Sequence, residues 1–119
     1  MTTATITTAQ DTGFVRIAHG KDWLTVCERG VLLPGRGVAV LLPDGDQAAV
    51  FMDRSGQVYA IGNRDPFTGA YVLSRGLLGS AGGRPFVASP LLKQRFDLAT
   101  GACLDDEEAT VPVFAVRAD

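Results

Sequence analysis

Histidine and cysteine, the residues that most often hold metals or serve as catalytic bases and nucleophiles, are scarce in this chain of 119 residues. It has one histidine and two cysteines. His19 lies in a segment with few hydrophobic anchors, so we expect it at the surface rather than in a catalytic site. Cys27 and Cys103 lie in apolar, strand-like runs, where burial raises the pKa of a thiol. We expect both to be inert packing residues rather than a disulfide or a metal pair.

Long hydrophobic runs and clusters of basic charge are also missing. No stretch approaches the roughly 20 apolar residues that cross a bilayer, and the first residues lack the basic and apolar regions of a signal peptide. These absences predict a cytoplasmic protein without membrane contacts, in which cysteines stay reduced. The 11 basic and 13 acidic residues give a net charge of −2. The basic residues are scattered, which argues against nucleic-acid binding.

Two glycine-rich segments, residues 35–37 and 76–83, lack the context of a nucleotide site. Neither follows a strand and opens a helix, as the dinucleotide fingerprint requires. We therefore expect turns there, and no flavin or nicotinamide site in this chain.

The residues that are present predict one mainly β domain. The length suits one domain rather than two, and a content of 46% hydrophobic and 20% charged residues is typical of globular proteins. Residues 1–13 are rich in threonine and alanine and are predicted to form a flexible tail. Residues 14–119 are predicted to form the single domain.

Strand signals recur at intervals of about ten residues and are separated by turns rich in proline and glycine. Residues 14–17 form either a short strand or an arm. The one plausible helix is a short one after Gly69, through Tyr71 and Leu73. The pattern favours a small barrel or sandwich, with strands predicted at residues 23–27, 38–42, 47–52, 57–61, 86–88, 95–98 and 111–116.

Residues 62–98 contain two similar loops, NRDPFTGA at 63–70 and SPLLKQRFD at 89–97, each after a short apolar run. On these residues the chain resembles the Rieske ferredoxin-like domain, whose loops read C-x-H-x-G-A and C-P-x-H-G-W-x-F-D. The resemblance implies an all-β Rieske-like fold with an inserted two-loop subdomain at about residues 62–98. The four ligand slots fall on Asp65, Phe67, Ser89 and Leu92.

These four side chains differ from the ligands of a Rieske centre, which takes two thiolates and two imidazoles. The counts of histidine and cysteine exclude any realignment that restores the set. We therefore predict no metal and no cofactor in this chain. We further expect Phe67 and Leu92 to pin the loop tips together, and Asp65 to pair with Arg64, Lys93 or Arg95.

Within this superfamily the motifs NRDPF, LSRG, SPL-x-KQRFDL and TG-x-CLD, spread over about residues 23–116, resemble the small subunits of assimilatory NAD(P)H-dependent nitrite reductases. The resemblance implies a supporting subunit of an enzyme that reduces nitrite to ammonium with six electrons in nitrate assimilation. The large subunit of such enzymes carries FAD, an iron–sulfur cluster and siroheme. No catalytic residue is expected in this chain. The candidates for contact with the large subunit are Arg64, Asp65, Phe67, Lys93, Gln94 and Arg95.

Two alternatives stay open at this point. The first is a stand-alone Rieske-type ferredoxin that serves an oxygenase. The second is a β-barrel adaptor that binds another protein through the same loops. For Arg64, Lys93 and Arg95, a role in holding the loops is weighed equally with a role in contact.

Overall fold

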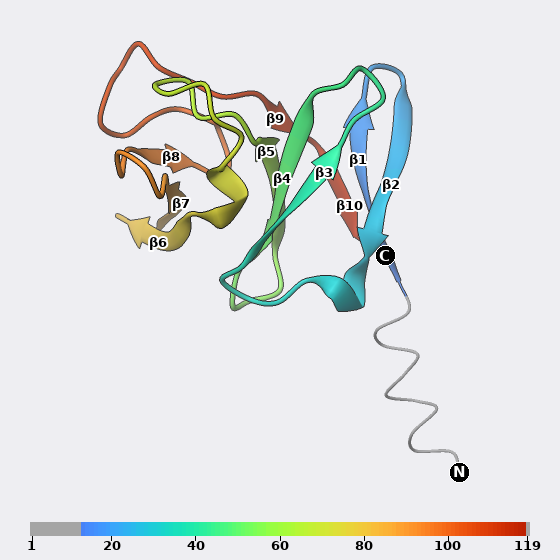
Figure 1. Ribbon diagram of the computed structural model, residues 1–119. Coiled ribbons are helices and arrows are strands. Elements are labelled where there is room, and N and C mark those ends of the chain that lie inside the picture. The colour runs from blue at the N-terminus through green and yellow to red at the C-terminus, as the bar shows by residue number, and fades with distance from the viewer. Residues whose placement is uncertain (1–12, 119) are drawn as a thin grey trace.

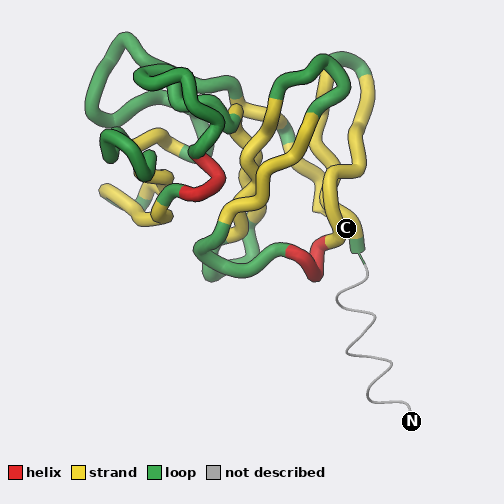
Figure 2. The backbone as a smooth tube through the Cα atoms, in the orientation of Figure 1, coloured by secondary structure: helices red, strands yellow, loops and turns green. Residues whose placement is uncertain are grey.

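The computed structural model describes residues 13–118, so most of the predicted tail lies outside the described residues, and the domain boundaries stay a prediction. Strands and two single-turn 3-10 helices make up the regular structure of this part (Figures 1 and 2), which confirms the all-β class. The strands are β1 (Phe14–His19), β2 (Asp22–Glu28), β3 (Gly37–Leu41), β4 (Gln47–Met52), β5 (Val58–Gly62), β6 (Leu77–Ala81), β7 (Arg84–Ala88), β8 (Arg95–Asp97), β9 (Val113–Phe114) and β10 (Val116–Ala118). The 3-10 helices are η1 (Arg29–Val31) and η2 (Leu73–Arg75).

Three antiparallel sheets build the fold. The first has the order β10-β1-β2, the second β3-β4-β5-β9 and the third β6-β7-β8. The first two sheets form a barrel-like half, and the third belongs to the predicted loop subdomain beside it (Figure 1). The strand predicted at residues 111–116 is split at Ala115: β9 pairs with β5 and β10 pairs with β1. This split lets one short segment join the two barrel sheets.

Strand β4 is the wall that both halves share. Ala48 and Val50 point into the core of the barrel half, whereas Ala49 and Phe51 point into the core of the loop subdomain. Successive residues of a strand face opposite sides, so a strand between two cores is apolar at every position. This explains why the run AAVF shows no alternation of polar and apolar residues.

The two hairpins predicted from glycine turns are confirmed. In the β3–β4 turn, Leu42 N–H donates to Asp46 C=O (2.8 Å) and Gly45 has φ of 91°. The β4–β5 turn repeats this geometry with Gly56, also at φ of 91°. A three-residue loop that ends in a left-handed residue is a common hairpin form, and glycine adopts that conformation without steric cost.

Residues 14–17, for which the sequence left a short strand or an arm open, belong to a central strand. β1 pairs with β10 on one side and with β2 on the other, and Val15 and Ile17 are fully buried. His19 ends this strand half-buried, with Nε2 3.2 Å from Asp44 Oδ2, rather than lying free at the surface. The helix predicted after Gly69 is limited to η2, because Tyr71 forms a β-bridge with Arg64 instead.

If β1 is a core strand, removing the Ile17 side chain should destabilise the protein strongly. We expect Ile17→Ala to lower the free energy of unfolding by about 2–5 kcal/mol, through lost burial and the cavity left behind. Thr25→Ala, at an exposed position on β2, should change it by less than about 0.5 kcal/mol. Urea denaturation of both variants measures the difference, and equal stabilities would contradict a buried β1.

Candidate functional site

The first loop of the predicted pair is closed by two backbone hydrogen bonds. Asp65 N–H donates to Ala70 C=O (2.8 Å), and Gly69 N–H donates to Asp65 C=O (2.7 Å). Gly69 has φ of 81°, in the left-handed region. The Arg64 guanidinium lies over this glycine, where an added Cβ would meet it at 3.3 Å. Glycine therefore suits this position for both its backbone and its small size.

The second loop has the same backbone plan. Ser89 N–H donates to Gln94 C=O (2.9 Å), and Lys93 N–H donates to Ser89 C=O (3.1 Å). Lys93 takes the left-handed position with φ of 65°, and within residues 13–118 it is the one non-glycine residue with a positive φ. The Rieske motif has glycine in this slot. Because lysine has a Cβ, the left-handed backbone conformation costs it free energy.

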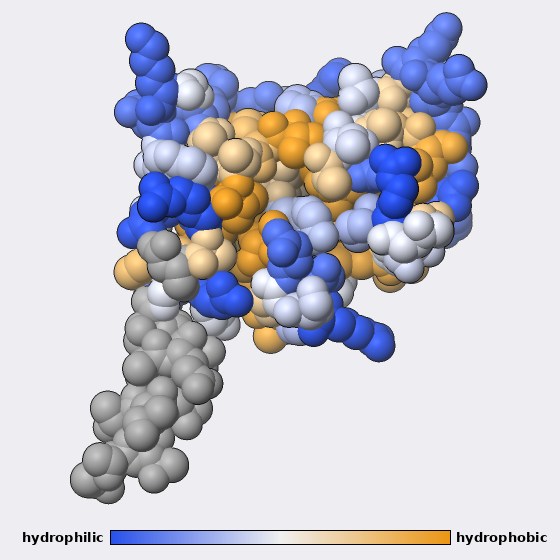
Figure 3. Space-filling model, turned by 180° about the vertical axis from the view of Figure 1, so that it is seen from behind, coloured by the Kyte–Doolittle hydropathy of each residue, from blue (hydrophilic) through white to orange (hydrophobic). Residues whose placement is uncertain are grey.

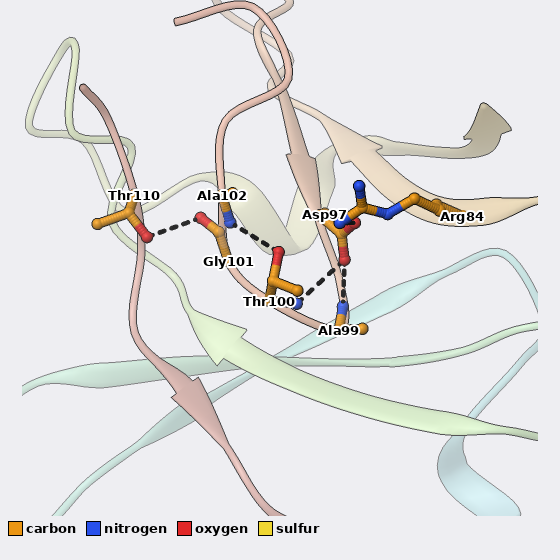
Figure 4. A network of polar contacts seen from close by, with 7 residues as sticks. All are labelled: Arg84, Asp97, Ala99, Thr100, Gly101, Ala102 and Thr110. Carbon is orange, nitrogen blue, oxygen red and sulfur yellow. Dashed lines mark hydrogen bonds and ion pairs between the residues drawn. The ribbon is translucent and has the colours of Figure 1, made fainter. Parts of the chain in front are cut away.

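A third copy of the loop follows, and the sequence analysis missed it. Asp97 N–H donates to Ala102 C=O (2.9 Å), and Gly101 N–H, from a residue with φ of 78°, donates to Asp97 C=O (2.8 Å). Thr100 Oγ1 accepts from Ala102 N–H (3.2 Å), as Thr68 does from Ala70 in the first loop. The shared pattern D-x-x-T-G-A at 65–70 and 97–102 was the available signal. Figure 4 shows this third loop.

Asp97 holds the third loop through its side chain as well. Its Oδ1 accepts from Ala99 N–H (2.7 Å) and from Thr100 N–H (3.0 Å). Its Oδ2 makes no hydrogen bond of good geometry, but it forms an ion pair with the Arg84 guanidinium at the start of β7 (Figure 4). The ion pair offsets the cost of burying this carboxylate fully. Asp97 is thus engaged in the fold rather than available to a ligand.

The first two loops are joined by a buried hydrogen bond between the slots where a Rieske domain has its two cysteines. Ser89 Oγ donates to Asp65 Oδ2 (2.6 Å), and Asp65 Oδ1 accepts from Phe67 N–H (2.8 Å). The exposed fractions are 0% for Asp65 and 1% for Ser89. We call this pair the loop clamp. The predicted pairing of Asp65 with a basic side chain is therefore wrong, because the buried carboxylate is satisfied by a hydroxyl and an amide instead.

The basic side chains that were expected around Asp65 lie elsewhere. Arg95 binds Asp105 with its backbone N–H (2.8 Å) and its guanidinium (2.8 Å). Arg64 and Lys93 are exposed. The hydrogen bonds from Arg95 lower the pKa of Asp105 below its ordinary value. The pair therefore stabilises the fold at neutral pH, and this contribution is lost as pH falls through the lowered pKa.

The two apolar residues in the histidine slots behave differently from each other. Phe67 is half-buried, packs against the subdomain core and has its ring centroid 6.3 Å from that of Phe96. Leu92 is 57% exposed. Phe67 thus holds the first loop against the subdomain core, whereas the prediction that Leu92 pins the loop tips is wrong because its side chain is exposed. The loop clamp supplies the connection that was assigned to Leu92.

The residues in the four slots do not fit a [2Fe-2S] cluster of the Rieske type. They offer one carboxylate, one hydroxyl and two hydrocarbon side chains, with neither thiolate nor imidazole. In the described part of the chain, no group of three or more metal-ligating side chains is found. The thiols of Cys27 and Cys103 lie in separate core clusters, and burial raises the pKa of Cys27.

The surface around the loop tips contains apolar residues that the sequence analysis did not predict as contacts with a partner. Tyr71 is 44%, Leu91 48% and Leu92 57% exposed. Of the predicted contact residues, Asp65 is fully buried and so lies outside any surface that a partner could touch. On the face behind that of Figure 1, hydrophobic residues are interrupted by hydrophilic ones (Figure 3).

The fold and the loops can now be compared with known proteins. The family model described as the Rieske-like [2Fe-2S] domain matches residues 22–119. This chain belongs to that family. A nitrite reductase (NADH) small subunit from Salmonella typhimurium is 47% identical over 97 residues, which cover 81% of this chain and 89% of that protein. Its similarity therefore extends over both the barrel half and the loops.

Two further relatives are informative. The crystal structure of a Mycobacterium tuberculosis protein assigned as an NADH-dependent nitrite reductase small subunit matches with a TM-score of 0.72 and 44% identity, covering 92% of this chain and 97% of that one. A Klebsiella oxytoca NAD(P)H nitrite reductase large subunit is 37% identical over 99 residues, which cover 83% of this chain and 10% of that protein. Among residues 13–118, no helix is long and apolar enough to cross a membrane.

The loop clamp should contribute more to stability than an exposed contact of the same kind. Ser89→Ala leaves a buried carboxylate oxygen without its donor, so we expect it to cost about 1–3 kcal/mol of unfolding free energy. Ser55 Oγ donates to Asp53 Oδ1 over the same 2.6 Å at an exposed turn. Ser55→Ala is therefore the matched control and should cost less than about 0.5 kcal/mol. Similar losses in chemical denaturation would refute a special role for the buried pair.

The strained backbone at Lys93 predicts a substitution that raises, rather than lowers, the free energy of unfolding. Lys93→Gly relieves the left-handed conformation but increases the entropy of the unfolded chain, so we expect a net gain of about 0.5–1 kcal/mol. Lys93→Ala removes the charge and keeps the strain, so it should give no gain. Thermal unfolding followed by circular dichroism measures both, and a gain for alanine alone would point to charge rather than strain.

Proposed function

We propose that this chain is the small, cofactor-free subunit of an NAD(P)H-dependent nitrite reductase and that it acts by binding and orienting the large subunit. The observation that carries this proposal is the 47% identity to the Salmonella small subunit over most of both chains. Nitrite is reduced to ammonium in the large subunit, which supplies FAD, an iron–sulfur cluster and siroheme. This chain contributes no catalytic residue.

The Klebsiella relative supports the choice of partner. There, a domain similar to this chain is part of the same polypeptide as the large subunit. A domain that is covalently joined to its partner in one protein is a natural candidate for non-covalent assembly with that partner in another. The small subunit in this proposal does separately what the fused domain does in one chain.

We further propose the loop tips as the surface that contacts the large subunit. The two exposed basic residues, Arg64 and Lys93, border the exposed apolar side chains of Tyr71, Leu91 and Leu92. Phe67, Gln94 and Arg95, from the same two loops, are half-buried. Apolar groups surrounded by charged ones are typical of protein interfaces.

A cytoplasmic location is part of the same proposal. The nicotinamide cofactor that the large subunit uses is supplied there, and reduced cysteines are the rule in that compartment. The two thiols of this chain lie in different cores and are free.

The alternative of a stand-alone Rieske-type ferredoxin requires a redox cluster. The carboxylate, hydroxyl and hydrocarbon groups in the four slots do not provide its ligands, so the observations favour the nitrite reductase subunit. An adaptor for another protein uses the same loops and differs only in its partner. Whether this chain binds the nitrite reductase large subunit therefore decides between the two.

Co-expression with the large subunit tests the proposal. We expect the two chains to co-purify, and nitrite-dependent oxidation of NADH or NADPH to fall when this chain is omitted. Arg64→Ala and Leu92→Ser should each weaken co-purification by about tenfold, as expected for side chains at the centre of an interface. Lys21→Ala, at the exposed turn between β1 and β2, is the control and should bind normally. Failure of the wild-type chains to associate would contradict the proposed function.

A further inference from the structure

Strand β6 has a free hydrogen-bonding edge. It pairs with β7 on one side and has no strand on the other among residues 13–118. The hairpin turn has two residues, Gly82 and Gly83, both with positive φ, so Ala81 and Arg84 form the hydrogen-bonded pair next to it.

The register shows which backbone groups lie on that edge. Hydrogen-bonded and non-hydrogen-bonded pairs alternate along an antiparallel ladder. Ser80 opposite Pro85 and Leu78 opposite Val87 are therefore the non-hydrogen-bonded pairs. Pro85, which has no N–H, fits this position. The N–H and C=O groups of Leu78 and Ser80 thus point away from β7, and residues 13–118 provide no partner for them.

This edge lacks the features by which proteins protect free strands. Charged residues, prolines and bulges normally prevent a free edge from pairing with another chain. β6 reads Leu-Leu-Gly-Ser-Ala, has no bulge, and exposes 75% of Leu77. The β8 and β10 edges carry charged residues. At β3, η2 lies against the start of the strand, where Gly37 meets the Ser74 carbonyl, while Leu41 at its end is 73% exposed.

A groove of about 630 Å³ runs beside the free edge. One wall is formed by the β6 residues from Leu77 to Ser80, and the other by Tyr59 and the turn between β4 and β5. The groove therefore has the side chains of Tyr59, Leu77 and Leu78 next to the unpaired backbone groups. An extended segment can use both, through main-chain hydrogen bonds and alternate side chains.

The groove carries charges of both signs. Arg54 and Asp53 line it, and the Asp53 carboxylate accepts from Ser55 and Gln57. Arg84 lies between two lining residues and is 57% exposed, but it forms an ion pair with the buried Asp97. Arg54 is exposed and forms no ion pair within residues 13–118, so it can take an acidic side chain of a bound segment.

We propose that β6 accepts an extended β-strand from the nitrite reductase large subunit, with apolar side chains facing Leu77 and Tyr59 and an acidic one facing Arg54. This inference rests on the proposed function. It adds a second contact, away from the loop tips, which is made largely by the backbone.

The test removes the edge donor without disturbing the hairpin. Ser80→Pro deletes the outward N–H, at a place where proline is tolerated in an edge strand. Ser80→Ala keeps that N–H and is the matched control. With the full-length subunits, we expect Ser80→Pro to weaken binding of the large subunit by about tenfold or more and Ser80→Ala to change it by less than about twofold. Denaturation of each isolated variant confirms that it is folded.

A second pair of variants tests the apolar groove independently. Leu77→Lys places a charge on the free edge and should weaken binding by about tenfold or more. Leu41→Lys introduces the same charge at a residue of nearly equal exposure, 73%, on β3 and should bind normally. If Ser80→Pro and Leu77→Lys both bind like the wild type, the proposed strand addition is overturned while the proposed function stands. If the wild-type subunits do not associate, the proposed function itself fails.

Sedimentation of the isolated chain tests whether a second copy of this chain, rather than the large subunit, pairs with the β6 edge. A dimer that Ser80→Pro dissociates, together with unchanged binding of the large subunit, would assign the edge to a second copy of this chain and overturn the proposal. A wild-type monomer combined with the losses above supports it.

Discussion

The hydrogen bond from Ser89 to Asp65 connects two loops that are 24 residues apart, at the place where a Rieske domain has a metal cluster. Both groups are buried, so water does not readily compete for their hydrogen bond. The carboxylate also accepts a hydrogen bond from the amide of Phe67. A short hydrogen bond to a charged acceptor is among the stronger polar contacts in proteins. The positions of the loop tips, and hence of the surface that they present, depend on this contact.

Backbone geometry explains how the loops keep their form without metal ligands. Three successive loops close with the same pair of hydrogen bonds and the same left-handed residue, supplied by Gly69, Lys93 and Gly101. Each loop also begins with a side chain that accepts from the backbone two residues further on. The conformation is therefore local, and burial against the shared β4 wall fixes how the loops are placed.

Local patterns made most of the strands, the glycine turns of the two barrel hairpins and the first two loops predictable from the sequence. The prediction of turns throughout residues 76–83 was wrong, because Leu77–Ala81 form strand β6 and the turn is limited to Gly82 and Gly83. The contacts between loops were not predictable, because nothing in the sequence pairs Asp65 with Ser89 rather than with a nearby arginine. Leu92 was expected to be buried because it occupies a slot where a Rieske domain has a ligand, but the second loop turns it outward. The central position of β1 was hidden by its short run of apolar residues, and the third loop by the absence of a ligand pattern.

The central claim is that the loop clamp replaces the cluster, and the iron content of the isolated chain tests it most directly. The protein is purified without oxygen, incubated with iron and sulfide under reducing conditions, desalted, and analysed for iron, acid-labile sulfide and visible absorption. The account predicts a colourless protein with far less than one iron per chain. Two irons and two sulfides per chain, with the absorption of a [2Fe-2S] centre, would contradict it.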